Sequence, residues 1–164
     1  RPNTMADANA PYQLVNLTME LAQALKPGDI IENSYYMFWH PYIVESILSS
    51  LESDSSEDSP PVTVRVIHYG RRDLFEPISV LQENITLDST NTANGHFRLY
   101  RFNLADCRPD EETVKLARDR IGETDHRMLS NNATYFALSC RLTDEAFDRC
   151  KRNIGRFRVV NPIG

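Results

Sequence analysis

Two histidines and the start of one predicted helix are the features of this sequence that could together do thiol chemistry. Ser130, Asn131 and Asn132 are all favourable N-cap residues, so a helix is expected to begin at one of them. The next side chain, at Ala133, would then lie beside unpaired backbone N–H groups and the positive end of the helix dipole. A cysteine at that place would be a reactive thiolate. Alanine has only a methyl group, so the sequence has no nucleophile there.

The histidines supply the other half of such a site. A cysteine nucleophile is normally paired with a histidine, which a third polar group orients. His40 and His68 lie on neighbouring predicted strands and are the two candidate histidines. With four histidines in the chain, two can fall on strands by chance, and a histidine on an apolar strand is more often a hydrogen-bonded core residue. The spacing alone therefore favours a structural interpretation over a catalytic one.

The hydrophobic pattern predicts the elements that must position these residues. Pro11 suits a first helical turn and four leucines follow near one face, so an amphipathic helix is predicted over residues 11–25. Alternating or β-branched runs predict strands, and they form an antiparallel sheet because no helical crossover separates them. The expected strands are residues 30–32, 35–44, 62–69, 80–86 and 96–103. Three further helices are expected over residues 109–121, from the cap at 130–132, and over 143–153.

The predicted fold class is therefore α+β, with an antiparallel sheet of about four to six strands packed against three or four helices. Residues 1–10 are expected to be a flexible lead-in, and residues 26–155 one domain that follows the N-terminal helix. Within that domain, residues 51–61 are acidic and serine-rich and are predicted to be an exposed, mobile loop insertion. Residues 156–164 form a tail.

Composition limits the partners. The chain has 164 residues, 41% of them hydrophobic, and its net charge of -5 argues against a nucleic-acid partner, because phosphate binding needs clustered cations. The three cysteines have no short spacing, so neither a disulfide framework nor a metal site is predicted, and no cofactor is expected. Cys140 would lie roughly 10 Å along the helix from position 133 and is predicted to be structural. No apolar run of about 18 residues occurs, and the N-terminus lacks a charged segment that leads into a hydrophobic one, so neither a membrane span nor a signal peptide is predicted. A cytoplasmic location is expected.

Several pieces of the chain resemble the lecithin:retinol acyltransferase (LRAT)-like family, over about Lys26 to Arg141. They are the run Lys-Pro-Gly-Asp-Ile-Ile-Glu at 26–32, His40, Ile67-His68, and Asn-Ala-Thr-Tyr-Phe at 132–136 followed by Cys140-Arg141. The family is similar in fold to a circularly permuted papain-like cysteine peptidase. The resemblance implies that His40 is the general base, that His68 orients it, and that position 133 carries the nucleophile that takes an acyl group from a phospholipid. It also implies a supporting role for Asn132.

The chain departs from the family pattern at several of these places. Ala133 stands where the family has its cysteine, Thr134 and Tyr135 replace a usual Glu-His, and Pro41 stands where tryptophan commonly follows the first histidine. Of the aromatic residues at 35, 36, 38 and 39, half are expected in the core, although such side chains could line an acyl groove. Two arginines at 71 and 72 are expected in a solvated turn, with contact to lipid phosphates as the alternative.

Three functional hypotheses follow. In the first, the chain is an LRAT-like domain that lacks its nucleophile and serves as a lipid-binding or protein-interaction module, peripheral to membranes. In the second, a native cysteine has been exchanged for Ala133, and the parent is a thiol acyltransferase or phospholipase acting on phospholipid acyl groups. In the third, it is a picornaviral non-structural protein that uses the same histidine and Asn-Cys boxes as a scaffold to support replication through host contacts. The expected partners are thus a phospholipid or acyl ligand, or another protein.

Overall fold

A computed structural model of the chain describes residues 10–35, 37–49, 59–128 and 130–154. The expectations for the lead-in, for most of the acidic loop and for the tail fall outside these ranges.

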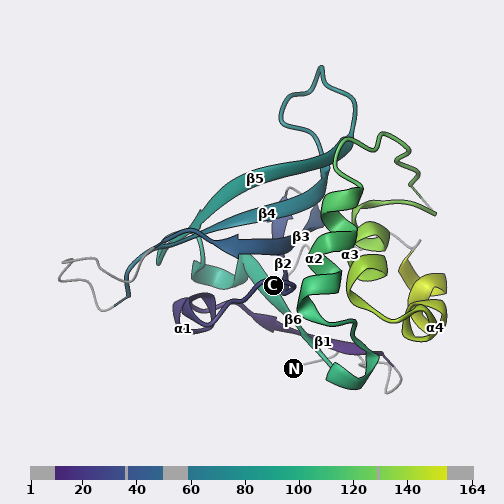
Figure 1. Cartoon of the computed structure of the whole chain (residues 1–164). Coiled ribbons are helices and arrows are strands. Elements are labelled where there is room, and N and C mark those ends of the chain that lie inside the picture. The colour runs from purple at the N-terminus through teal and green to yellow at the C-terminus, as the bar shows by residue number, and fades with distance from the viewer. Residues whose placement is uncertain (1–9, 36, 50–58, 129, 155–164) are drawn as a thin grey trace.

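An antiparallel sheet of six strands forms the centre of the molecule, in the order β1-β6-β2-β3-β4-β5 (Figure 1). The strands are β1 (Tyr12–Asn16), β2 (Ile30–Tyr35), β3 (Phe38–Ile47), β4 (Val62–Gly70), β5 (Ser79–Leu87) and β6 (Phe97–Phe102). The helices are α1 (Met19–Gln23), α2 (Asp110–Asp119), α3 (Ala133–Arg141) and α4 (Asp144–Ile154), with short 3-10 turns at Ala93–Gly95 and Leu104–Asp106. This arrangement confirms the predicted α+β class.

The helix predicted over residues 11–25 is wrong. Tyr12–Asn16 is instead β1, which pairs with β6 from Tyr12 opposite Phe102 to Asn16 opposite Arg98. Only Met19–Gln23 is helical, and it starts at Thr18, whose side chain accepts a hydrogen bond from the Leu21 N–H at 3.2 Å. The leucine spacing suits a helix, but the ladder of hydrogen bonds to β6 outweighs that local preference. The strand predicted over residues 35–44 also has different bounds in the structure. Tyr35 is the last residue of β2, and β3 begins only at Phe38.

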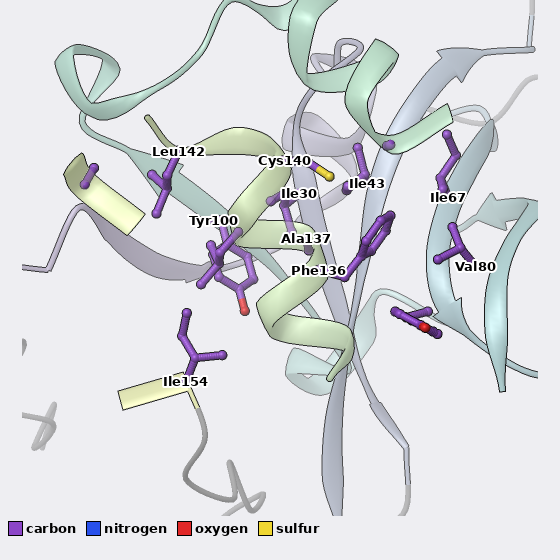
Figure 2. Packing of buried hydrophobic residues seen from close by; sticks show 14 residues of the cluster. Ile30, Ile43, Ile67, Val80, Tyr100, Phe136, Ala137, Cys140, Leu142 and Ile154 are labelled. Carbon is purple, nitrogen blue, oxygen red and sulfur yellow. The ribbon is translucent and has the colours of Figure 1, made fainter. Parts of the chain in front are cut away.

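Two hydrophobic clusters lie on opposite faces of the sheet. The first brings isoleucines of β2, β3 and β4 together with α3, where Phe136 and Cys140 are buried (Figure 2). Burial raises the pKa of the Cys140 thiol to about 11, so it is inert, as its predicted structural role requires. The second cluster joins α1 to the other face through residues such as Val44 and Val66. Both faces of β3 and β4 are therefore apolar.

The Lys26–Asp29 turn and the end of α3 meet at Asp110. The carboxylate of Asp110 accepts hydrogen bonds from Lys26 Nζ at 3.1 Å and from the buried Arg141 Nη1 at 2.7 Å. Gly28 fits between them with a φ of +92°, and a Cβ there would lie 3.2 Å from both Arg141 Nη1 and the Asp110 Cα. Two pieces of the family resemblance that are far apart in sequence thus form one structural corner.

Gly28→Ala is expected to reduce the free energy of unfolding by about 2–3 kcal/mol, through the positive φ and the close contact with the Asp110 backbone. Gly122→Ala is the matched control, because Gly122 has the same φ but nothing within 4 Å of an added Cβ. We expect that control to lose only about 1 kcal/mol. Urea denaturation of both variants measures the difference, and equal losses would contradict a packed corner.

Candidate functional site

Side chains from three neighbouring strands form a hydrogen-bonded network. His40 on β3 and His68 on β4 are joined by a contact of 2.8 Å between His40 Nε2 and His68 Nδ1. The other ring nitrogen of His68, Nε2, lies 2.7 Å from Glu83 Oε2 on β5. The structure therefore places the two histidines predicted from the sequence side by side and adds a carboxylate to them.

The chain of contacts determines which ring nitrogens carry protons. A carboxylate only accepts hydrogen bonds, so His68 Nε2–H donates to Glu83. In a neutral imidazole the other nitrogen is then an acceptor, so His68 Nδ1 accepts from His40 Nε2–H. His40 Nδ1 is consequently unprotonated and free to accept a hydrogen bond from a ligand.

Both imidazoles are neutral at physiological pH. Burial, together with the neighbouring His68 and His126, lowers the pKa of His40 to about 3. Burial also lowers the pKa of His68 to about 4, assisted by the Arg72 charge. A general base works best when its pKa lies near the operating pH. This pair is therefore built to hold a hydrogen-bonding pattern rather than to take up protons.

Tyr42 and Gly70 shape the space around the pair. The Tyr42 ring lies 4.8 Å from each imidazole, measured between ring centroids, and burial raises the pKa of its phenol to about 12. Gly70 leaves room for the rings, because a Cβ there would lie only 2.8 Å from His68 Nδ1 and 3.4 Å from His40 Cε1. A larger residue at this position would displace His68.

Ala133 reaches this site from the other face of the sheet. Side chains alternate along a strand, so His68 shares a face with Val66, whereas Ile67 lies on the face that packs against α3. By the same alternation His40 lies on the face opposite α3. A cavity of about 410 Å³ at the end of the strands connects the two sides. Its walls include both imidazoles and Tyr42 from one side, and Ala133, His126, Tyr69 and Ile78 from the other.

Asn132 is the residue that caps α3. Its side-chain oxygen accepts a hydrogen bond from the Tyr135 N–H at 2.8 Å, and its amide nitrogen donates to the carbonyls of Met128 and Ile154 at 2.9 and 3.3 Å. Among the candidate N-caps, the structure thus selects Asn132. Both polar atoms of the Asn132 side chain are therefore used to hold the start of α3 against its neighbours.

The sequence interpretation missed Glu83, Tyr42, Gly70 and His126. Glu83 could have been found, because the register of the β4–β5 hairpin places it opposite Val66, on the same face as His68. His126 lies in the loop before α3, for which the sequence has no periodic signal. Its ring contacts Tyr69 edge-on, with the ring centroids 5.3 Å apart.

The expectation that half of the aromatic cluster is core is wrong. Tyr35 and Phe38 are 61% and 48% exposed, because they lie where β2 ends and β3 begins, at the turn of the hairpin. Trp39 is half-buried, and the Arg98 guanidinium stacks 3.5 Å above its ring. The fourth aromatic residue, Tyr36, lies outside the described residues.

Comparison of the chain with protein-family models, with curated proteins and with solved structures finds no match. Within the described ranges, no three His, Cys, Asp or Glu side chains come together in a way that could hold a metal ion. In the same part of the chain, none of the helices has both the length and the apolar character needed to cross a membrane.

Proposed function

We propose that this chain is an LRAT-like domain, with the permuted papain-like fold of that family, that binds an amphiphilic lipid without transforming it. The observation that carries the proposal is the cavity beside the His40–His68 pair, which has neutral imidazoles and an alanine where the family resemblance places the nucleophile.

The lining of the cavity suits a ligand with one acyl chain and an anionic head group. Tyr69, Ile78 and Leu74 contribute apolar surface. Arg71 and Arg72 lie at the exposed edge, where a guanidinium can pair with a phosphate or carboxylate. The unprotonated His40 Nδ1 would accept a hydrogen bond from a hydroxyl on the ligand. A volume of about 410 Å³ is within the range of small-molecule sites.

No described thiol replaces the missing nucleophile. None of Cys107, Cys140 and Cys150 lines the cavity, and burial raises the pKa of each. A raised pKa keeps a cysteine in its unreactive thiol form. These features support binding over acyl transfer.

A second candidate function is the thiol acyltransferase or phospholipase in which a native cysteine has been exchanged for Ala133. The Glu83–His68–His40 chain favours it, because the unprotonated Nδ1 of His40 is the atom that would accept a proton from a thiol. The start of α3 opens into the same cavity.

The proposal predicts that Ala133→Trp, which fills the cavity, weakens binding of a fluorescent long-chain fatty acid at least about tenfold, equivalent to about 1.4 kcal/mol. Ala105→Trp is the matched control, since Ala105 is exposed and does not line the cavity. Fluorescence titration, with unlabelled lysophosphatidic acid as competitor, measures both affinities. The absence of saturable binding by the unmodified protein, or equal affinities of the two variants, would refute a lipid site in this cavity.

A further inference from the structure

Large apolar side chains are exposed at the tips of two neighbouring loops beside the cavity. At the β2–β3 turn, Tyr35 and Met37 are each 61% exposed and Phe38 is 48% exposed. In the β4–β5 loop, Leu74 and Phe75 are 75% and 95% exposed. We call these five side chains the apolar rim. Scattered exposed apolar residues are ordinary, but a cluster of this kind marks an interaction surface.

The two tips belong to one surface. Tyr35 from the first loop and Leu74 from the second both line the cavity, together with Arg71 and Arg72. The β4–β5 loop projects from the top of the molecule in Figure 1, beyond the end of the sheet. The rim therefore borders the cavity through Tyr35 and Leu74.

Hydrogen bonds within the β4–β5 loop hold its apolar side chains outward. The Asp73 carboxylate accepts from the Phe75 N–H at 3.0 Å, and the Asp73 carbonyl accepts from the Glu76 N–H at 3.1 Å. Arg72 Nη2 donates to the Gln82 carbonyl at 2.8 Å and ties the loop to β5. The turn thus presents Leu74 and Phe75 in a defined conformation, although this exposure costs favourable burial.

We propose that the apolar rim docks on the surface of a phospholipid membrane. Its side chains stand on two separate protruding turns, which can enter the acyl boundary of a bilayer without the broad flat contact that a protein partner needs. Arg71 and Arg72 precede Leu74 and Phe75 in the same loop and are exposed, so their guanidinium groups can pair with lipid phosphates once Phe75 is inserted. This inference rests on the proposed function, because docking here would bring the cavity mouth to the source of its lipid.

Sedimentation with vesicles of phosphatidylcholine and phosphatidylserine tests the docking. The unmodified protein is expected to sediment with the vesicles, and the double variant Met37→Ser/Phe75→Ser to bind at least about tenfold more weakly. Leu104→Ser is the matched control, because Leu104 is 74% exposed but does not line the cavity, and it should bind like the unmodified protein. Equal binding by the double variant, or no sedimentation of the unmodified protein, would overturn the proposal. The second result would leave a protein partner as the remaining occupant of the rim.

The same variants separate membrane docking from the lipid site. Neither Met37 nor Phe75 lines the cavity, so the double variant should bind the fluorescent fatty acid normally in buffer without vesicles. Ala133→Trp should show the opposite behaviour, with fatty-acid binding weakened and vesicle binding kept. Loss of vesicle binding in Ala133→Trp would contradict a separate docking surface.

Discussion

Lowering the pH from 7 to 4 is expected to reduce the free energy of unfolding by about 3 kcal/mol through His68. In the unfolded chain a histidine takes up a proton as the pH falls below about 6.5. In the folded protein His68 resists protonation down to a pKa of about 4, and His40 down to about 3. The unfolded state therefore binds more protons across this window. The two histidines contribute fully to the free energy of unfolding above pH 6.5. This contribution is lost as the pH falls towards 4 for His68 and towards 3 for His40.

Urea denaturation at a series of pH values measures this effect. The interval from pH 6.5 to 5 is the most informative, because model carboxylates titrate mainly below it. His40→Gln keeps a polar side chain that cannot titrate in this range, and its stability should depend less steeply on pH than that of the unmodified protein. His96→Gln, which removes an exposed histidine, is the matched control. An identical slope for His40→Gln and the unmodified protein would contradict the buried neutral pair.

Sequence patterns predicted the central strands well but not the first element. The strands predicted over residues 62–69 and 80–86 match β4 and β5 to within one residue at each end, because β-branched runs bounded by turn residues are a local signal. The segment 11–25 has leucine spacing compatible with a helix. Its conversion to β1 depends on pairing with β6, some 80 residues further along the chain, which a local pattern does not contain.

The candidate site was predictable in part. His40 and His68 fall on neighbouring strands, and their pairing follows from the sheet. Which face they occupy could not be deduced, because β3 and β4 carry apolar residues on both faces, one packed on α3 and the other joined to α1. Whether both imidazoles face the start of α3, as a thiol site would need, therefore required tertiary information. That is why the sequence suggested a compact triad, while the structure places Ala133 across a cavity.

Restoring a thiol at position 133 is expected to leave the protein inactive in acyl transfer. In Ala133→Cys the new side chain would be the first residue of α3, where the helix dipole lowers the pKa of a thiol below the usual value of about 8.5. His40, however, lies on the opposite face of the sheet, and its pKa of about 3 makes it a weak proton acceptor. We therefore expect the variant to react with iodoacetamide but not to accept an acyl group from phospholipid.

Mass spectrometry of Ala133→Cys after incubation with short-chain phosphatidylcholine tests most directly the claim that the cavity binds lipid without transforming it. Under native conditions we expect one non-covalent lipid per chain. Under denaturing conditions we expect no more covalent acyl adduct on the variant than on the unmodified protein. The unmodified protein is the reference because it has the same three other cysteines. A covalent acyl adduct on the introduced thiol that disappears in Ala133→Cys/His40→Ala would contradict the binding account and establish the parent as a thiol acyltransferase.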